Sequence, residues 1–270
     1  EALKIVNKEE ESMLKVKEAK ELILNIDGGH IKSKETDIRS FEAMTSVFYR
    51  PDAIKSNEKG TRNYLSSKSC AASTLDDNGK EMISNTIVAA IKEGMTPNTH
   101  ITALSDGAAN CWRIVDALKP LCQKVTSILD WFHISMKIEN ISLPEEIKPK
   151  FLRVKWHLWR GNVSMALTRL EQLKSMITTQ KIVKKLSEFI TYIKNNRHKI
   201  VDYRQRKKSG LVFTSNLAES TVESLINQRC KGQQHMKWSR EGLDPILQLR
   251  AQIHSAAWNA KWKSAVLTAL

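Results

Sequence analysis

The sequence lacks the features that mark membrane, secreted and zinc-stabilised proteins. No uninterrupted apolar run among the 270 residues approaches the roughly 18 to 20 residues that a membrane-spanning helix needs. The N-terminal part alternates charged and apolar side chains without the apolar core of a signal peptide. The 4 cysteines lie far apart and form no CxxC pair, so no zinc framework is indicated. We therefore expect a soluble cytoplasmic protein with reduced thiols and no membrane partner.

The chain is rich in positive charge, and this charge is unevenly distributed. With 41% hydrophobic and 27% charged residues, the chain can bury a core of one large or two modest domains. Residues 1–144 contain 19 Lys and Arg against 20 Asp and Glu, whereas residues 145–270 contain 24 against 9. The whole net charge of +14 therefore arises in the second half. A Lys-rich solvated helical surface is the plain interpretation of this excess.

Nucleic acid is the partner class that the basic half favours over a membrane surface. Cationic side chains release counterions from phosphates, and flat aromatic rings stack on exposed bases. Tryptophans alternate with basic residues in this half, at positions 156, 159, 238, 258 and 262. The predicted nucleic-acid contacts are the dense cluster Arg204, Arg206, Lys207 and Lys208, followed by Arg229, Lys231, Lys237 and Arg240.

Hydrophobic patterning predicts an α/β fold, a mixed sheet flanked by helices and interrupted by an all-helical insertion. Because Gly28 and Gly29 follow the first apolar run, we expect the chain to turn sharply after Asp27. Strands are predicted at 21–27, 41–49, 64–74, 101–104 and 125–130, the first three as an antiparallel meander, and helices at 81–93, 111–121, 217–229 and 241–267, with about three more in 145–208. The predicted parts are an N-terminal helix or linker (1–20), the first part of the α/β core (21–144), the helical insertion (145–210) and the C-terminal part of the core (211–270).

Aspartates stand where three of the predicted strands end, at Asp27, Asp106 and Asp130. In open α/β sheets a ligand site forms at the carboxyl ends of the strands. Carboxylates brought together repel one another unless a cation lies between them, and all-oxygen ligands favour Mg²⁺ or Mn²⁺. Two such ions, roughly 3.5–4 Å apart, hold the attacking and leaving oxygens of a phosphoryl transfer. The pattern therefore indicates nuclease or strand-transfer chemistry.

Each of these acidic residues also has a plainer interpretation. An aspartate followed by glycine is common in turns, which covers Asp27 and Asp106. Glu219 stands at capping-box spacing from a preceding asparagine. Glu223, one helical turn later, shares its face and is a rival ligand. For His133, a role in the core, with a hydrogen bond to a backbone carbonyl, explains the residue as well as a role in the site does.

Several sequence blocks, taken in order, resemble bacterial insertion-sequence transposases with a ribonuclease-H-like DDE core. The order of these blocks is more specific than any one of them, and the resemblance covers about residues 20–262. The blocks are IDGGHIK (26–32), LSDGAANCW (104–112), ILDWFHI (128–134) and AESTVESLINQRCKG (218–232), continued by MKWSREG (236–242) and LQLR (247–250).

The resemblance implies catalytic roles residue by residue. Asp27 and Asp106 are similar to the first and second catalytic aspartates, and Glu219 is similar to the catalytic glutamate. The spacing from Glu219 to the Lys-Gly pair at 231–232 fits the family, whereas Glu223 would require a deletion of four residues. The three acidic residues would hold Mg²⁺ or Mn²⁺, expected as two ions.

The resemblance also gives supporting roles to two further regions. Asp130 and His133 look like the (C/D)xxH signature of some branches, which supports the site without supplying a principal ligand. The helical block at 145–208 lies where related enzymes carry an insertion domain. Trp156 or Trp159 is either its DNA-facing aromatic residue or part of its own core, and core packing is the favoured alternative.

The implied enzyme is a DDE transposase that cuts DNA at insertion-sequence ends and joins the 3′-hydroxyl to target DNA. We expect DNA as the partner, a homodimer on paired ends, and a bacterial cytoplasmic location. Because the sequence starts at Glu1 without Met, we expect an upstream module that recognises the element ends. The alternatives are another ribonuclease-H-like nuclease, against which the helical insertion argues, and an inactive or truncated copy that only binds DNA.

Overall fold

The computed structural model describes residues 16–61, 63–231 and 236–255. Most of the predicted N-terminal helix or linker, both Trp258 and Trp262, and the end of the predicted helix 241–267 lie outside these residues. Among the described helices, none combines the length and the apolar character that crossing a bilayer requires.

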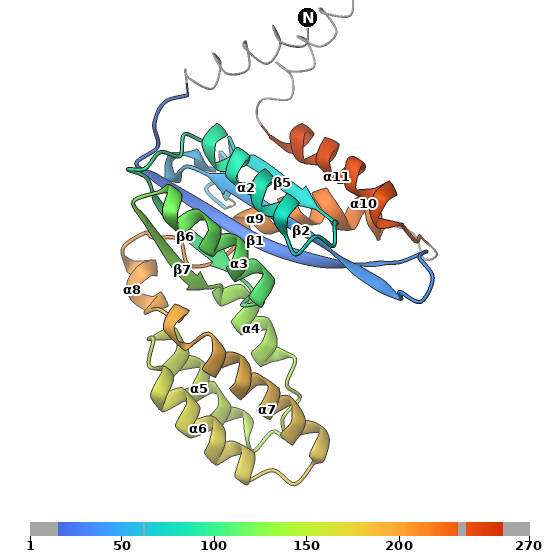
Figure 1. Cartoon of the computed structure of the whole chain (residues 1–270). Coiled ribbons are helices and arrows are strands. Elements are labelled where there is room, and N and C mark those ends of the chain that lie inside the picture. Colours follow the sequence, from blue (N-terminus) through green and yellow to red (C-terminus); the bar gives the residue numbers. More distant parts are fainter. Residues whose placement is uncertain (1–15, 62, 232–235, 256–270) are drawn as a thin grey trace, which may run out of the picture. The chain divides into compact units, whose positions relative to one another are not determined.

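The fold is built on a mixed five-stranded sheet with the order β5-β2-β1-β6-β7, as the α/β prediction requires (Figure 1). β1 pairs antiparallel with β2, and β2 pairs antiparallel with β5, which confirms the predicted meander. The predicted strand 64–74 is instead two strands, because polar residues at 66–68 interrupt it, and its first part pairs with β3 in a separate hairpin. The strands are β1 (Glu21–Lys32), β2 (Ser40–Tyr49), β3 (Ile54–Ser56), β4 (Asn63–Leu65), β5 (Ser69–Ser73), β6 (His100–Ser105) and β7 (Lys124–Leu129).

The prediction that the chain turns after Asp27 is wrong. β1 continues to Lys32, and Gly28 and Gly29 lie opposite Met44 and Ala43 of β2 in unbroken register. A Cβ atom on Gly28 would collide with the carboxylate of Glu42, so this glycine makes room for a neighbouring side chain. Asp27 therefore lies inside a strand and not at its end.

The chain divides into two compact units, and the division passes through β6 and β7. The first unit comprises Glu1–Ala103, Ala109–Thr126 and Asn216–Leu270. Within it, α2 packs on β2 and β5, α11 packs on β5, and α9 contacts β2. Its helices are α2 (Lys80–Lys92), α3 (Ala109–Leu118), α9 (Asn216–Val222), a π-helical turn (Glu223–Asn227), α10 (Gln228–Cys230) and α11 (Arg240–His254), with 3-10 turns at Pro51–Ala53 and Lys119–Leu121.

The second unit, Leu104–Ala108 and Ser127–Ser215, is largely helical. The helices predicted in 145–208 are present as three long helices and one short one. The buried aromatic and aliphatic residues Phe151, Leu158, Leu170 and Phe189 lie on the long helices α5 to α7. The helices are α4 (Trp131–Glu139), α5 (Lys148–Trp159), α6 (Val163–Ser175), α7 (Gln180–Asn195) and α8 (Tyr203–Lys208), with a 3-10 turn at Arg197–Lys199 (Figure 1).

The two tryptophans of α5 have different environments. The ring of Trp159 lies 4.7 Å from that of Trp131 and stacks on Tyr203 at 6.0 Å. Tyr203 is itself buried and donates a hydrogen bond to the carbonyl of Leu129 at 2.7 Å. Trp156, in contrast, is 59% exposed. Trp159 is therefore a half-buried member of an aromatic cluster in the second unit, whereas Trp156 lies on the surface of that unit.

A buried carboxyl in the first unit gives the fold a pH-dependent stability. Glu93 accepts a hydrogen bond from Ser69 Oγ at 2.9 Å, and burial raises the pKa of the Glu93 carboxyl above its ordinary value. The folded state then binds this proton more tightly than the unfolded state. The stability gained from Glu93 is therefore present below the ordinary carboxyl pKa and is lost as the pH rises through the raised one.

We expect Glu93→Gln, which keeps the acceptor for Ser69, to gain stability relative to the wild type between pH 4 and pH 7. Urea unfolding midpoints of both proteins at the two pH values measure this change. A difference between the proteins that is the same at both pH values would contradict the prediction.

Candidate metal centre

Two acidic side chains of the first unit form a candidate metal site. Asp27 projects from the middle of β1 and Glu219 from α9, and both are half-buried. Each offers a carboxylate oxygen, and these oxygens lie within 4.8 Å of each other. Two carboxylates this close are stabilised when a hard divalent cation lies between them. The structure thus brings together two of the three predicted catalytic residues.

The position of Asp27 is fixed by the centre of the sheet. Its strand has β2 on one side and β6 on the other. Asp27 Oδ1 accepts a hydrogen bond from the Gly28 N–H at 2.8 Å, and its backbone carbonyl accepts one from Thr45 Oγ1 at 3.2 Å. A carboxylate held in this way needs little reorganisation to bind a cation.

Glu219 is placed by the buried face of its helix. Ala218, Thr221 and Val222 of α9 are buried, and Lys68 Nζ donates a hydrogen bond to Thr221 Oγ1 at 2.7 Å. These contacts hold α9 against the rest of the first unit. The helix therefore keeps the Glu219 carboxylate close to that of Asp27.

Glu223, the rival ligand, lies in a different environment. It is exposed, and its carboxylate accepts a hydrogen bond from the side-chain amide of Asn227. The backbone between Glu223 and Asn227 forms a π-helical turn, so the spacing of side chains along this helix departs from that of a regular α-helix. The described cluster of potential metal ligands includes Glu219 and does not include Glu223.

Lys231, a predicted nucleic-acid contact, has its ammonium group beside Gly29 of β1. Its ammonium nitrogen would be 3.4 Å from a Cβ atom placed on Gly29. Gly29 follows Asp27 by two positions on β1, and residues two apart in a strand share a face. A cation therefore stands on the same face of β1 as the candidate site.

The other predicted basic contacts of the first unit are partly engaged with neighbouring residues. The guanidinium of Arg229 lies 5.0 Å from the centre of the Trp238 ring. Arg240 forms an ion pair with Glu35 at 3.1 Å, which gives it a structural role. Lys237 is exposed.

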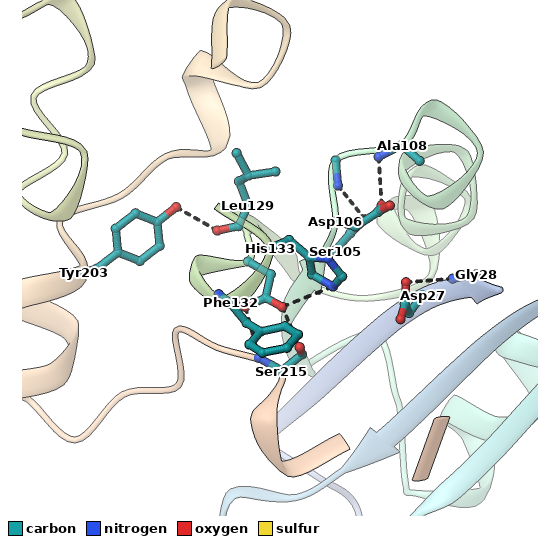
Figure 2. A network of polar contacts seen from close by, with 12 residues as sticks. Asp27, Gly28, Ser105, Asp106, Ala108, Leu129, Phe132, His133, Tyr203 and Ser215 are labelled. Carbon is teal, nitrogen blue, oxygen red and sulfur yellow. Dashed lines mark hydrogen bonds and ion pairs between the residues drawn. The ribbon is translucent and has the colours of Figure 1, made fainter. Parts of the chain in front are cut away.

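Asp106 directly follows β6 and belongs to the second unit. Its Oδ1 accepts hydrogen bonds from the Ala108 N–H at 2.9 Å and from Ser105 Oγ at 3.3 Å. Its backbone carbonyl accepts one from Tyr192 Oη at 2.8 Å. Figure 2 shows the Asp106 carboxylate and its bond to Ala108. The turn that carries this aspartate is therefore fixed from both its side chain and its backbone.

The turn can pack closely because Gly107 has no side chain. It has a φ of 98°, and a Cβ atom here would lie within 2.9 Å of Leu129, Tyr192 and Asn196. Asn196 also donates a hydrogen bond to the Gly107 carbonyl at 3.5 Å. Sequence reasoning missed both side chains, because Tyr192 occurs in an ordinary amphipathic helical pattern and Asn196 directly follows that helix.

Asp130 is buried and its oxygens are occupied by its own chain. It caps α4 by accepting a hydrogen bond from the Phe132 N–H at 3.0 Å, and it also accepts hydrogen bonds from the N–H of Ser215 at 3.1 Å and from the Ser215 hydroxyl. His133 Nε2 lies 3.6 Å from Asp130 Oδ2. Burial raises the pKa of the Asp130 carboxyl, and the bonds from Ser215 and the charge of His133 oppose this effect. These contacts occupy the Asp130 carboxylate with groups of its own unit.

The basic cluster at 204–208 lies on α8 in the second unit. Arg204, Lys207 and Lys208 are exposed. Arg206 is half-buried, and its Nε donates a hydrogen bond to the Val212 carbonyl at 2.9 Å. Three of the four predicted contacts in this cluster are therefore open to a partner.

Comparison with known proteins identifies a family for the chain. A search of the curated proteins finds no match. Residues 3–264 match the uncharacterised protein family UPF0236, which spans nearly the whole sequence. The chain therefore belongs to the uncharacterised protein family UPF0236.

Proposed function

We propose that this protein is a DDE transposase that cuts DNA at insertion-sequence ends and joins the freed 3′-hydroxyl to target DNA. The observation that carries the proposal is the proximity of the Asp27 and Glu219 carboxylates, which are distant in sequence and lie within 4.8 Å. The ordered sequence blocks and the basic second half support it.

The donor atoms of the candidate site suit a hard divalent cation. Asp27 and Glu219 supply only carboxylate oxygens, which Mg²⁺ and Mn²⁺ prefer. When bound, such ions supply the positive charge that stabilises an in-line displacement at phosphorus. Two ligands do not complete a site. From its place in the sequence blocks we propose Asp106 as the third ligand, and we propose two ions.

The remaining chemistry is assigned to basic side chains and to DNA itself. Lys231, on the same face of β1 as Asp27, would neutralise a substrate phosphate. The exposed Arg and Lys side chains of α8 would contact the DNA backbone. Water is the nucleophile for cleavage and the 3′-hydroxyl is the nucleophile for joining, so no covalent enzyme intermediate is expected. A homodimer on paired element ends in the bacterial cytoplasm is part of the proposal.

The proposal is tested by the metal dependence of DNA cleavage. We expect the protein to nick a duplex that contains the DNA flanking its own gene with Mg²⁺ or Mn²⁺, and to lose this activity in excess EDTA. Gel analysis of labelled strands for joined products separates a transposase from a hydrolase. DNA binding without cleavage or joining in either metal would overturn the proposal and leave a DNA-binding protein.

A further inference from the structure

We propose that α5 and α6 of the second unit form a second DNA contact, a groove that binds the phosphodiester backbone through Lys150, Arg153 and Arg169. This inference rests on the proposed function, because it assigns a further contact with the same DNA. The groove is separate in sequence from the predicted contacts on α8 and in the C-terminal region.

The groove has a volume of about 440 Å³ and lies within one unit. Its lining includes the three cations together with Gln172 and Ser175, and it contains no acidic residue. Hydroxyl and amide groups beside cations are the side chains that bind phosphate oxygens. The chemical character of the lining therefore matches that of a polyanion.

The positive charge of the groove is not compensated from within the described chain. On the same helix, Lys148 pairs with Glu145 and Lys155 pairs with Glu139. In the part of the chain that the structure describes, no carboxylate lies within 4.0 Å of the groove cations Lys150, Arg153 and Arg169. Since clustered unpaired cations repel one another, an anion in the groove would relieve this repulsion.

Arg169 is held by a neighbouring histidine. Its Nε donates a hydrogen bond to His157 Nε2 at 3.1 Å. Because arginine can only donate, His157 must be unprotonated at Nε2. Burial, followed by the charges of Arg169 and Arg160, lowers the pKa of His157, which favours this neutral form. The bond uses Nε, so the two terminal nitrogens of the guanidinium can bind a phosphate side by side.

The surroundings of the groove favour DNA over a small anion. Trp156 follows Arg153 by three positions on α5, which places the two on neighbouring parts of the helix surface, and it is 59% exposed. An exposed indole beside cations can stack on a base. Residues 127–215 also contain 18 Lys and Arg against 7 Asp and Glu, which attracts a long polyanion from a distance.

The groove is tested by measuring the affinity of the full chain for a fluorescent random-sequence duplex, in EDTA, over a series of salt concentrations. The test variant is Arg153→Gln/Arg169→Gln. The control is Lys181→Gln/Lys184→Gln, which removes the same charge from two exposed lysines of α7. We expect the test variant to weaken binding about tenfold and to reduce the salt slope by about 2, near 0.9 for each lost phosphate contact. The control should change affinity less than about twofold.

A third variant separates the shape of the arginine from its charge. Arg169→Lys keeps the charge but loses the planar fork, so we expect about a threefold loss of affinity. Circular dichroism melts establish that each variant is folded. An unchanged DNA affinity in Arg153→Gln/Arg169→Gln, or an equal loss of affinity in the α7 control, would overturn the proposal that DNA binds in the groove.

The outcomes also distinguish the groove from the proposed activity. If Arg153→Gln/Arg169→Gln weakens DNA binding but the wild-type protein never cuts DNA, the transposase proposal is wrong and the proposed DNA contact in the groove is supported. If the variant keeps both metal-dependent cleavage and wild-type DNA affinity, the transposase proposal is supported and the proposed groove contact is wrong.

Discussion

Asp27→Asn is expected to reduce metal-dependent DNA cleavage at least about a thousandfold, which corresponds to roughly 4 kcal/mol of lost transition-state stabilisation. Asparagine has the shape of aspartate and can still accept the hydrogen bond from the Gly28 N–H, so β1 should remain intact. The variant loses the negative charge that would hold a divalent cation. DNA affinity should be unchanged or higher, because a carboxylate that repels phosphate has been removed.

Glu219→Gln should reproduce this loss, and Glu223→Gln provides the matched control. The two glutamates lie one helical turn apart, but only Glu219 belongs with Asp27 to the described cluster of potential metal ligands. We expect Glu223→Gln to keep cleavage within about twofold of the wild type, as for most exposed substitutions. The comparison requires strand-cleavage rates at saturating Mg²⁺. Retained cleavage in Asp27→Asn, or an equal loss in both glutamate variants, would refute the assignment.

Much of the fold was predictable because it depends on local patterns. Runs of apolar residues give the strands, and helical periods give α2 and the three long helices of the second unit. The error at Asp27 came from the same local rules. Two consecutive glycines usually indicate a turn, but here β2 supplies ten paired positions that keep β1 extended through them. Pairing between strands is a long-range property that a single segment does not reveal.

The candidate site was predictable only where a motif preserved its order along the sequence. The resemblance selected Asp27 and Glu219, and the structure places their carboxylates together. No motif indicated the hydrogen bond from Tyr192 to the Asp106 carbonyl. A tyrosine on an amphipathic helix gives the same sequence pattern whether it only packs or also donates a hydrogen bond. The hydrogen bond from Ser215 to Asp130 could not be predicted from the sequence either, since these residues are far apart along the chain.

Gly107→Ala is expected to destabilise the second unit by about 3 to 4 kcal/mol. A left-handed φ costs a non-glycine residue roughly 1 to 2 kcal/mol, and overpacking a filled site adds about 1 to 3 kcal/mol. Here the new methyl group would meet Leu129 Cδ1 and Asn196 Nδ2 at 2.8 Å and the Tyr192 ring at 2.9 Å. These three side chains are packed around the turn, so they cannot all move without disturbing Asp106.

Gly210→Ala separates the two contributions within the same unit. Gly210 has a φ of +67°, and no atom lies within 4 Å of a Cβ built on it. Only the backbone cost applies there, so we expect a loss of about 1 to 2 kcal/mol in urea unfolding. The difference between the variants then measures the crowding at Gly107. If the proposed role of Asp106 is right, Gly107→Ala should also lose cleavage at temperatures where it is still folded, whereas Gly210→Ala should not. Equal destabilisation of the two variants would show that α7 does not clamp this turn.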